Sequence, residues 1–228
     1  MKYKCYHGTQ SKFTSFSPEY LGKGNDQYGS GYYFTTSKDV ASGYASPKGY
    51  IINAEVELNK PIIIDESTKK QTRDLTKLQV RKLILTANNL ENYINDNYDV
   101  SYESRNSILN QIFELYEPTG ELIRTLNLIS KDIYGNDIEG IQNFNDNLRK
   151  ITGYDGIIVR HPNKLFLGET DFIIALFLNQ IDILSIEPYK GEGIVESIDK
   201  FGIFLNDVRK YDIPLVESIT NAYVAIFK

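Results

Sequence analysis

The sequence predicts an α+β fold, because strand patterns at its beginning and after its middle flank a long block with helical periodicity. The chain has 228 residues, of which 41% are hydrophobic and 24% are charged. These values are close to the averages of globular proteins, which excludes a disordered chain and a collagen-like repeat. Because a chain of this length can bury one sizeable core, we predict a single domain over residues 1–228.

Strand signals dominate the first 65 residues, which are rich in Tyr, Gly, Ser and Thr. Alternating or short apolar runs typical of strands occupy residues 2–6, 31–35, 50–58 and 62–64. An Asn-Lys-Pro break separates the last two runs. We therefore predict three strands followed by a short, buried fourth strand.

A block of helices is predicted from residue 66 to residue 150. Apolar residues recur there at helical spacing, for example at Val80, Leu83 and Ile84. Breaks that contain Pro and Gly divide the block, so we expect three to five helices. Strand signals return at residues 156–159, 172–177 and 181–186.

The last part of the chain, residues 191–228, is predicted to be a C-terminal appendage. It begins with a sequence broken by glycines and ends with apolar residues at helical spacing after Pro214. We expect one helix in this appendage.

Charge and composition restrict the possible function classes. The chain carries 25 Lys and Arg against 30 Asp and Glu, a net charge of −5, which excludes a protein whose whole surface holds nucleic acid. The amino terminus lacks the apolar run of a signal peptide, and no stretch has the length of a membrane span. The single cysteine, Cys5, cannot form an internal disulfide bond. We expect a cytoplasmic protein with no membrane contact.

Common metal-binding and nucleophile motifs are missing, since His7 and His161 are the only histidines. The sequence has no H-E-x-x-H and no C-x-x-C pattern, and we expect no metal site. Cys5 and His7 alternate onto one face of a strand, where side chains two positions apart project side by side. A catalytic thiol–imidazole pair needs hydrogen-bond reach, so this pairing is disfavoured.

Three ordered motifs carry more information. The first is Tyr-His-Gly-Thr at residues 6–9, and the second is Gly-Ser-Gly-Tyr-Tyr-Phe-Thr at 29–35, followed by Ser-Lys and by Tyr44, eleven residues after Tyr33. The third begins at Gly153 and includes Gly-Glu-Thr-Asp-Phe-Ile-Ile and a final Gln-Ile. Together they resemble ADP-ribosyltransferases of the diphtheria-toxin and poly-ADP-ribose-polymerase type, the His-Tyr-Glu class, and especially phage- and toxin-borne mono-ADP-ribosyltransferases.

The resemblance implies an ADP-ribosyltransferase-like fold with a split β-sheet core and an NAD-binding cleft. The core would comprise residues 1–65 and 151–190, and residues 66–150 would form a helical insertion. Two small, mostly antiparallel sheets would face each other across the cleft. NAD+ would bind there as the substrate.

The resemblance also implies roles for single residues. His7 would donate a hydrogen bond to a ribose hydroxyl, and Gly8 would present its backbone to the carboxamide of nicotinamide. Tyr33 and Tyr44 would enclose the nicotinamide ring, because stacked aromatic rings attract each other beyond simple burial. The other positions expected to bind NAD+ are Thr9, Gly31 and Phe34.

A carboxylate is required as well. Cleavage of the nicotinamide–ribose bond passes through an oxocarbenium-like state, whose positive charge a carboxylate stabilises. Asp171 matches by position, because it directly precedes Phe-Ile-Ile where the family usually has Glu. Glu169 matches by chemistry and would share a face with Asp171 on an extended chain. We favour Asp171 as the catalytic acid, keep Glu169 as the alternative, and include His7 and Tyr33 in the catalytic set.

The implied function is mono-ADP-ribosyl transfer from NAD+ to a host macromolecule with release of nicotinamide, as in a phage or bacterial effector or toxin. The favoured acceptor is a protein, although a nucleic acid stays open because Arg73, Lys77 and Arg81 would share a helix face. Two alternatives are kept. One is a binding module that retains the fold without the chemistry and blocks a host factor, and the other is an NAD+ glycohydrolase.

Overall fold

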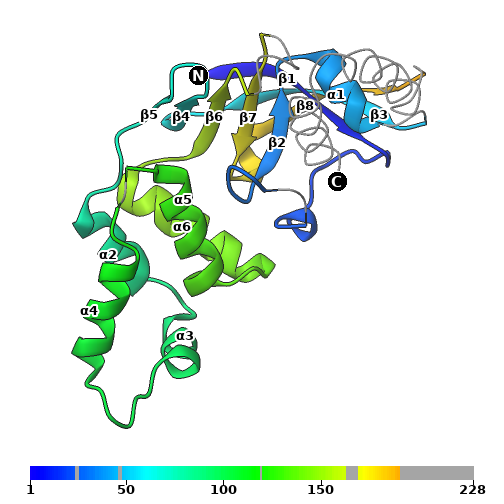
Figure 1. Ribbon diagram of the computed structural model, residues 1–228. Helices are drawn as coiled ribbons and strands as arrows, with labels where there is room; N and C mark the ends of the chain where they lie inside the picture. Colours follow the sequence, from blue (N-terminus) through cyan, green and yellow to red (C-terminus); the bar gives the residue numbers. More distant parts are fainter. Residues whose placement is uncertain (24–25, 46–47, 119, 163–168, 191–228) are drawn as a thin grey trace, which may run out of the picture.

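The computed structural model describes residues 1–23, 26–45, 48–118, 120–162 and 169–190. The described residues form one mixed sheet of eight strands, with a layer of helices beneath one end of it (Figure 1). The α+β class predicted from the sequence is confirmed. The predicted C-terminal appendage and its helix lie outside the described residues.

The strands follow the order β5-β4-β6-β7-β2-β1-β3-β8 across the sheet. Neighbouring strands run antiparallel, except β4 and β6, which run parallel. A parallel pair needs a crossover connection, and the helical block supplies it. The bounds are Lys2–Thr9 (β1), Tyr32–Thr35 (β2), Tyr50–Glu57 (β3), Pro61–Asp65 (β4), Lys70–Gln71 (β5), Gly156–Arg160 (β6), Asp171–Ala175 (β7) and Ile181–Pro188 (β8).

The sheet is weakest between β1 and β2. β1 pairs with β3 along its whole length, whereas its pairing with β2 consists of Tyr6 opposite Thr35. The four residues of β2 pair along their length with β7 instead. The expectation of two separate sheets is therefore wrong, because this one residue pair joins the two halves into a single hydrogen-bonded sheet.

Five α-helices occupy the described part of the segment between β5 and β6, in agreement with the three to five expected. The longest of them, α6, begins after Asp137, whose side chain accepts a hydrogen bond from the Gly140 N–H, and ends at Gly153 in the left-handed conformation. The bounds are Lys77–Leu85 (α2), Leu90–Asn97 (α3), Arg105–Leu115 (α4), Leu122–Leu128 (α5) and Ile138–Thr152 (α6), with a π-helical turn at Ile129–Tyr134 (η2).

Three shorter helices lie near the strands. The helix α1, Lys38–Ala45, packs against β1 and β3. It begins at the Lys of the Ser-Lys pair and carries Tyr44 of the second motif. Two 3-10 turns occupy Pro18–Tyr20 (η1) and Leu178–Gln180 (η3). The second motif is thus a strand followed by a helix.

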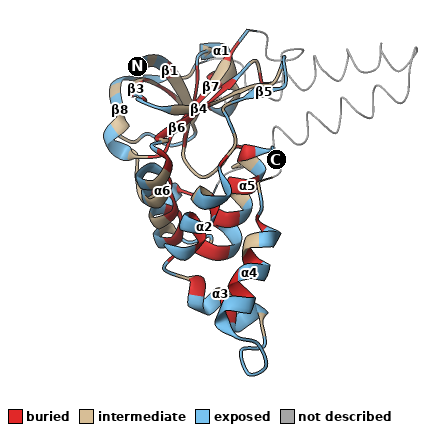
Figure 2. Ribbon diagram, turned by 90° about the vertical axis from the view of Figure 1, so that its left-hand side faces the viewer, coloured by how far each residue is buried: buried red, intermediate tan, exposed pale blue. Residues whose placement is uncertain are grey.

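The larger core cluster lies between the sheet and the helical layer (Figure 2). Ile62, Ile157 and Ile174 from the strands pack in this cluster with Leu83 and Ile133 from the helical block. Figure 2 shows the buried positions of the helices on their inward faces and the exposed positions outside. Because removal of apolar surface from water drives this packing, the helices fix β4, β6 and β7 in place.

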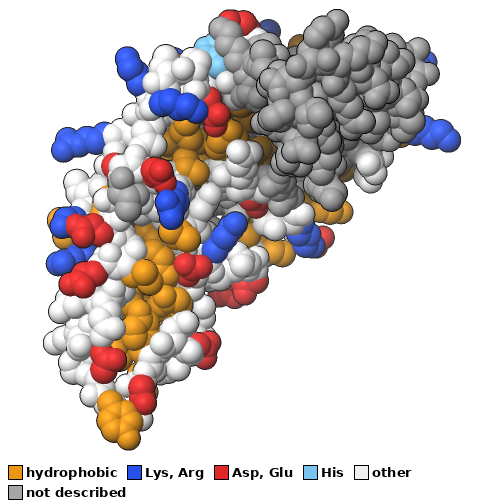
Figure 3. Space-filling model, viewed as in Figure 1, with side chains coloured by type: hydrophobic (Ala, Val, Ile, Leu, Met, Phe, Trp, Pro, Cys, Tyr) orange, Lys and Arg blue, Asp and Glu red, His pale blue; other side chains and the backbone are white. Residues whose placement is uncertain are grey.

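The predicted basic helix face does not form as expected. Arg73 lies before α2, which begins at Lys77, because Thr76 caps the helix with its side chain. The guanidinium of Arg81 lies 5.0 Å from the centre of the Phe113 ring, a cation–π contact. On the face seen in Figure 3, basic and acidic side chains are interspersed over the helical part.

Candidate active site

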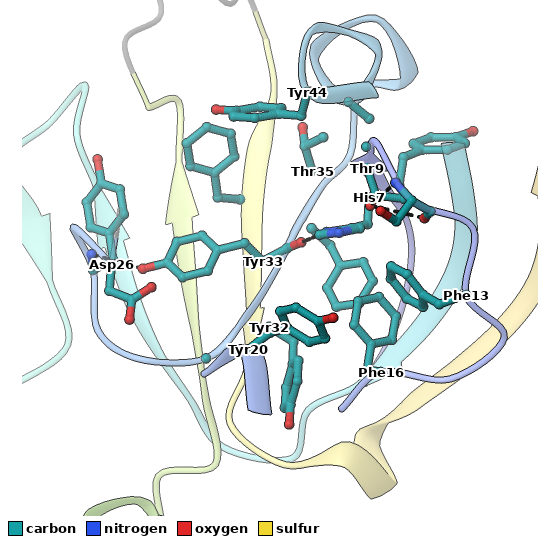
Figure 4. A pocket seen from close by; sticks show the side chains of 18 of the residues that line it. His7, Thr9, Phe13, Phe16, Tyr20, Asp26, Tyr32, Tyr33, Thr35 and Tyr44 are labelled. Atoms are coloured by element: carbon teal, nitrogen blue, oxygen red, sulfur yellow. Dashed lines mark hydrogen bonds between the residues drawn. The ribbon is translucent and has the colours of Figure 1, made fainter. Parts of the chain in front are cut away.

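A cavity of about 790 Å³ lies at the weak junction between β1 and β2. Its walls come from β1 and the loop after it, from β2 and α1, and from the ends of β4, β6 and β7 (Figure 4). The volume falls within the range of small-molecule sites. The residues expected to bind NAD+ all line this cavity: His7, Gly8, Thr9, Gly31, Tyr33, Phe34 and Tyr44.

His7 bridges the two strands at the junction. Its Nδ1 lies 2.8 Å from the carbonyl oxygen of Tyr33, which can only accept a hydrogen bond, so Nδ1 carries the hydrogen. Burial lowers the pKa of His7 below its ordinary value, which keeps the ring neutral at pH 7. Nε2 is then an acceptor. A ligand would therefore meet an acceptor at Nε2, whereas a donor to a ribose hydroxyl was expected from the sequence at this residue.

Aromatic rings surround the imidazole. The ring centres of Phe13, Phe16 and Phe34 lie 6.1, 5.2 and 5.8 Å from that of His7. Phe34 is only 2% exposed and packs in the second core cluster, so its main contribution is to hold His7. The loop residues Phe13 and Phe16 have no strand or helix pattern around them, so no local pattern indicated their role.

The Tyr33 side chain is fixed at its hydroxyl end. The hydroxyl donates to the Gly29 carbonyl at 2.7 Å and accepts from the Tyr28 N–H at 3.1 Å. Asp26 lies beside this end of the ring (Figure 4), and burial together with that carboxylate raises the pKa of Tyr33. The phenol therefore stays protonated, and its ring is presented to the cavity in one orientation.

Gly8 allows α1 to approach β1 closely. A Cβ at Gly8 would lie 1.8 Å from the carbonyl oxygen of Ala41, so no other residue fits without movement of the helix. Tyr44 stands one turn further along α1 and is 45% exposed at the mouth of the cavity. Thr9 exchanges hydrogen bonds with Ser11 through its hydroxyl, which orders the loop that follows β1.

The two candidate acids lie at the edge of this region. Asp171 is the first residue of β7, and its Oδ1 accepts from the His161 N–H at 3.3 Å. Glu169 is exposed, and its Oε2 lies 3.9 Å from Nδ1 of His161. Among the described residues that line the cavity, Phe172 and Pro162 are present but neither acid is. The structure thus places both acids beside the cavity rather than in its wall.

His161 is held in an unusual conformation between these acids. Its φ of 52° lies in the left-handed region, which non-glycine residues seldom adopt. Its buried Nδ1 has no hydrogen-bond partner in the described part of the chain. His161 therefore orients Asp171 through its backbone and faces Glu169 through its ring.

Two acids that the motifs did not indicate lie in the cavity wall itself, Asp26 and Glu66. Asp26 belongs to the loop before β2, and burial raises its pKa. Glu66 directly follows β4 and accepts a hydrogen bond of 2.7 Å from the Tyr28 hydroxyl. Both lie outside regular elements, where periodicity provides no guidance.

Cys5 is unsuited to nucleophilic chemistry. Its side chain is 2% exposed, and burial raises the pKa of the thiol to about 12. Within the described residues, no group of three or more His, Cys, Asp and Glu side chains is arranged to hold a metal ion. No helix in the same part of the chain has the length and apolar character needed to cross a bilayer.

Comparison with protein families assigns the class. The model of the family described as ADP-ribosyltransferase in polyvalent proteins matches residues 2–185, and the chain therefore belongs to this family of ADP-ribosyltransferases. No curated protein and no solved structure matches the chain. The resemblance found in the sequence is confirmed at the level of the family, and NAD+ is the substrate that such a domain uses.

Proposed function

We propose that the chain is a mono-ADP-ribosyltransferase of the His-Tyr-Glu class, which transfers ADP-ribose from NAD+ to a host macromolecule and releases nicotinamide. The observation that carries the proposal is the convergence of the first two motifs on one cavity. Seven residues of β1, of β2 and the position before it, and of α1 are expected from their motifs to bind NAD+, and they line a single space of about 790 Å³.

Nicotinamide binds between Tyr33 and Tyr44 in this proposal. Each aromatic contact contributes about 0.5–1.5 kcal/mol beyond burial. The backbone of Gly8 pairs with the carboxamide, and Nε2 of His7 accepts a hydrogen bond from a ribose hydroxyl. These contacts hold the glycosidic bond at the centre of the cavity, where a bound substrate is shielded from water.

A carboxylate beside the ribose lowers the barrier to bond cleavage. Positive charge develops on the ribose in the transition state, so a nearby carboxylate binds the transition state more strongly than NAD+ itself. Asp171 is proposed for this role, because two hydrogen bonds hold it at the start of β7. Its backbone N–H donates to Thr36 Oγ1 at 2.9 Å, and its carboxylate accepts from the backbone N–H of His161. Glu169 is the alternative acid.

The acceptor is proposed to be a protein, and the setting the bacterial cytoplasm, where the chain acts as a phage or bacterial effector. The interspersed charges of the helical part and the net charge of −5 support a protein acceptor over a nucleic-acid acceptor. Phosphate-rich acceptors would instead favour a continuous basic face.

Incubation with labelled NAD+ and bacterial lysate tests the proposal. Protein and nucleic-acid fractions are separated and counted for the wild type, Asp171→Asn and Glu169→Gln. We expect label in the protein fraction, and a loss of about 10²–10³-fold in the variant that lacks the catalytic acid. Asp182→Asn, which removes an exposed strand carboxylate from β8, serves as the matched control and retains full activity.

The proposal is refuted when the wild type transfers no label and leaves NAD+ intact. Release of free ADP-ribose without a labelled macromolecule would identify an NAD+ glycohydrolase instead. Label in the nucleic-acid fraction would correct the acceptor class while retaining the activity.

The second candidate function is a binding module without transferase activity. The observation that favours it is a set of exposed apolar side chains on the helical part: Leu78, Tyr102 and Leu115 are 63%, 88% and 64% exposed. Such a module would block a host factor through this surface. Thermal denaturation with and without NAD+ separates the candidates, because only a working cleft is stabilised by the nucleotide.

A further inference from the structure

Glu66 is the acid of the cavity wall whose place is set by strand register. Asp65, the last residue of β4, lies opposite Arg160 of β6, and Arg160 lies opposite Asp171 of β7. Neighbouring strands are about 4.8 Å apart, so the backbones at Asp65 and Asp171 are about 10 Å apart. Glu66, the next residue, donates its N–H to the Arg160 carbonyl at 3.1 Å and stays at this same edge.

The carboxylates of Asp65 and Glu66 have different environments. Oδ1 of Asp65 accepts hydrogen bonds from Ser67 and Thr68 and closes the turn after β4, so it is fully engaged in local structure. Glu66 instead lines the cavity. Oε1 of Glu66 accepts from the Tyr28 hydroxyl, while Oε2 receives no hydrogen bond from the described residues. One carboxylate oxygen is thus held in position and the other is available to a ligand.

Asp26, the other acid of the cavity wall, is a weaker candidate for such a role. Its carboxylate is hydrogen-bonded by Ser30 and lies near the cation of Lys131, while burial raises its pKa. Its charge is therefore already compensated within the chain. Glu66 lines the same cavity and has one carboxylate oxygen that receives no hydrogen bond from the described residues.

We propose that Glu66 is a catalytic general base, which activates the acceptor nucleophile for its attack on the ribose of NAD+. This role rests on the proposed transferase function. Its Oε2 accepts the proton of an N–H or O–H nucleophile on the acceptor side chain. As the nucleophile bonds to C1 of the ribose, the bond from C1 to nicotinamide breaks. The electron pair of that bond passes to nicotinamide, which leaves as a neutral molecule, and the proton stays on Glu66 until water removes it.

The arrangement divides two tasks between two carboxylates. The acid of β7 stabilises charge on the ribose, while Glu66, two strands away, activates the incoming group. Glycosidases that use two carboxylates leave space between them for the attacking molecule in the same way. The Tyr28 hydroxyl fixes the carboxylate, and burial together with Glu66 raises the pKa of Tyr28, so this donor keeps its proton.

Glu66→Gln tests the role, because Gln retains an oxygen that accepts the Tyr28 hydrogen bond but cannot take a proton. Initial rates of nicotinamide release and of label transfer from NAD+ to lysate protein are measured from pH 5 to 9. We expect kcat for transfer to fall by about 10²–10⁴-fold, with KM for NAD+ unchanged within twofold and with loss of the acidic limb of the pH profile. Asp65→Asn is the matched control and retains wild-type rates.

Tyr28→Phe distinguishes catalysis from structural support. It removes the hydrogen bond but keeps the carboxylate, so transfer should fall by less than tenfold. Equal losses in Tyr28→Phe and Glu66→Gln, with a raised KM for NAD+, would overturn the inference, and so would a Glu66→Gln variant with wild-type transfer. A wild type that neither binds nor cleaves NAD+ would instead overturn the proposed function itself, together with this role.

Discussion

Replacement of Gly8 by alanine tests whether the close approach of α1 to β1 creates the nicotinamide site. The added Cβ would lie 1.8 Å from the Ala41 carbonyl oxygen. Ordinary carbon–oxygen contacts are about 3.3 Å or longer, so α1 has to withdraw by about 1.5 Å. Tyr44 lies one turn further along the helix and moves with it. A misplacement of about 1 Å can cost about 100-fold in catalytic rate, and we expect a loss of affinity for NAD+ of the same size here.

The expected effect follows from ligand-linked stability. NAD+ at a hundredfold excess over the wild-type Kd stabilises the fold by about 2.7 kcal/mol, and a hundredfold weaker variant gains about 0.4 kcal/mol at the same concentration. In a chain of this size, 1 kcal/mol corresponds to about 2–4 °C in Tm. The wild type should therefore gain about 5–11 °C on addition of NAD+, and Gly8→Ala about 1–2 °C, in a thermal denaturation assay.

A second glycine provides the matched control. Gly120 has a φ of +82° and open space around the position of a Cβ, so Gly120→Ala introduces strain of about 1 kcal/mol without a clash. This variant should lose stability yet keep the full shift with NAD+. If Gly8→Ala keeps the wild-type shift as well, the close approach of α1 does not position Tyr44 for the nucleotide, and the reasoning is refuted.

Three further predictions concern groups around the cavity. Burial in the folded state lowers the pKa of His7 below its ordinary value of 6.5, so the free energy of unfolding should fall as the pH drops below 6.5. His7→Gln should flatten this pH dependence in urea titrations from pH 5 to 8. An unchanged pH dependence in the variant contradicts the prediction. The Cys5 thiol, whose pKa is raised from 9.0 to about 12, should contribute stability that is lost as the pH rises from 9 to 12, and iodoacetamide should label it only on unfolding. Tyr33→Phe leaves the ring in place but removes the hydrogen bonds of its hydroxyl to the Tyr28 N–H and the Gly29 carbonyl, so it should lower the free energy of unfolding by about 1–3 kcal/mol. The rise in Tm on addition of NAD+ should persist in this variant. Loss of that rise would show that the hydroxyl itself binds NAD+.

The parts of the site that could be predicted are those with a local signal. Residues 6–9 and 29–35 are adjacent to strand patterns, and the register of a strand fixes which side chains face the cavity. The position of Tyr44 could be predicted in the same way, because Tyr44 lies about one and a half turns after Lys38, the first residue of α1. These positions depend on short-range structure, and the structure places them together.

The parts that could not be predicted depend on distant pairing. The pairing of Tyr6 with Thr35 joins the two expected sheets into one, and no local pattern predicts how many residues two strands pair. Asp155 is a second example: it belongs to the third motif, yet its carboxylate accepts from the N–H groups of Asn59 and Lys60 at 2.8 and 2.9 Å. Its evident task is to hold the start of β4 beside that of β6.

The parallel pairing of β4 and β6 explains why the helical block supports the cavity. β4 ends at Asp65, whereas β6 begins at Gly156, which lies opposite Pro61 at the other end of β4. The chain must therefore return along a five-residue strand, a distance of about 16 Å, which no tight turn can span. The helices provide this return and bury the face of β4, β6 and β7 at the same time. The helical block thus allows the parallel pairing that places Glu66 and Asp171 at the same edge of the sheet. Because the inner face of the helices is buried against the sheet, an acceptor that contacts these helices must use their outer face.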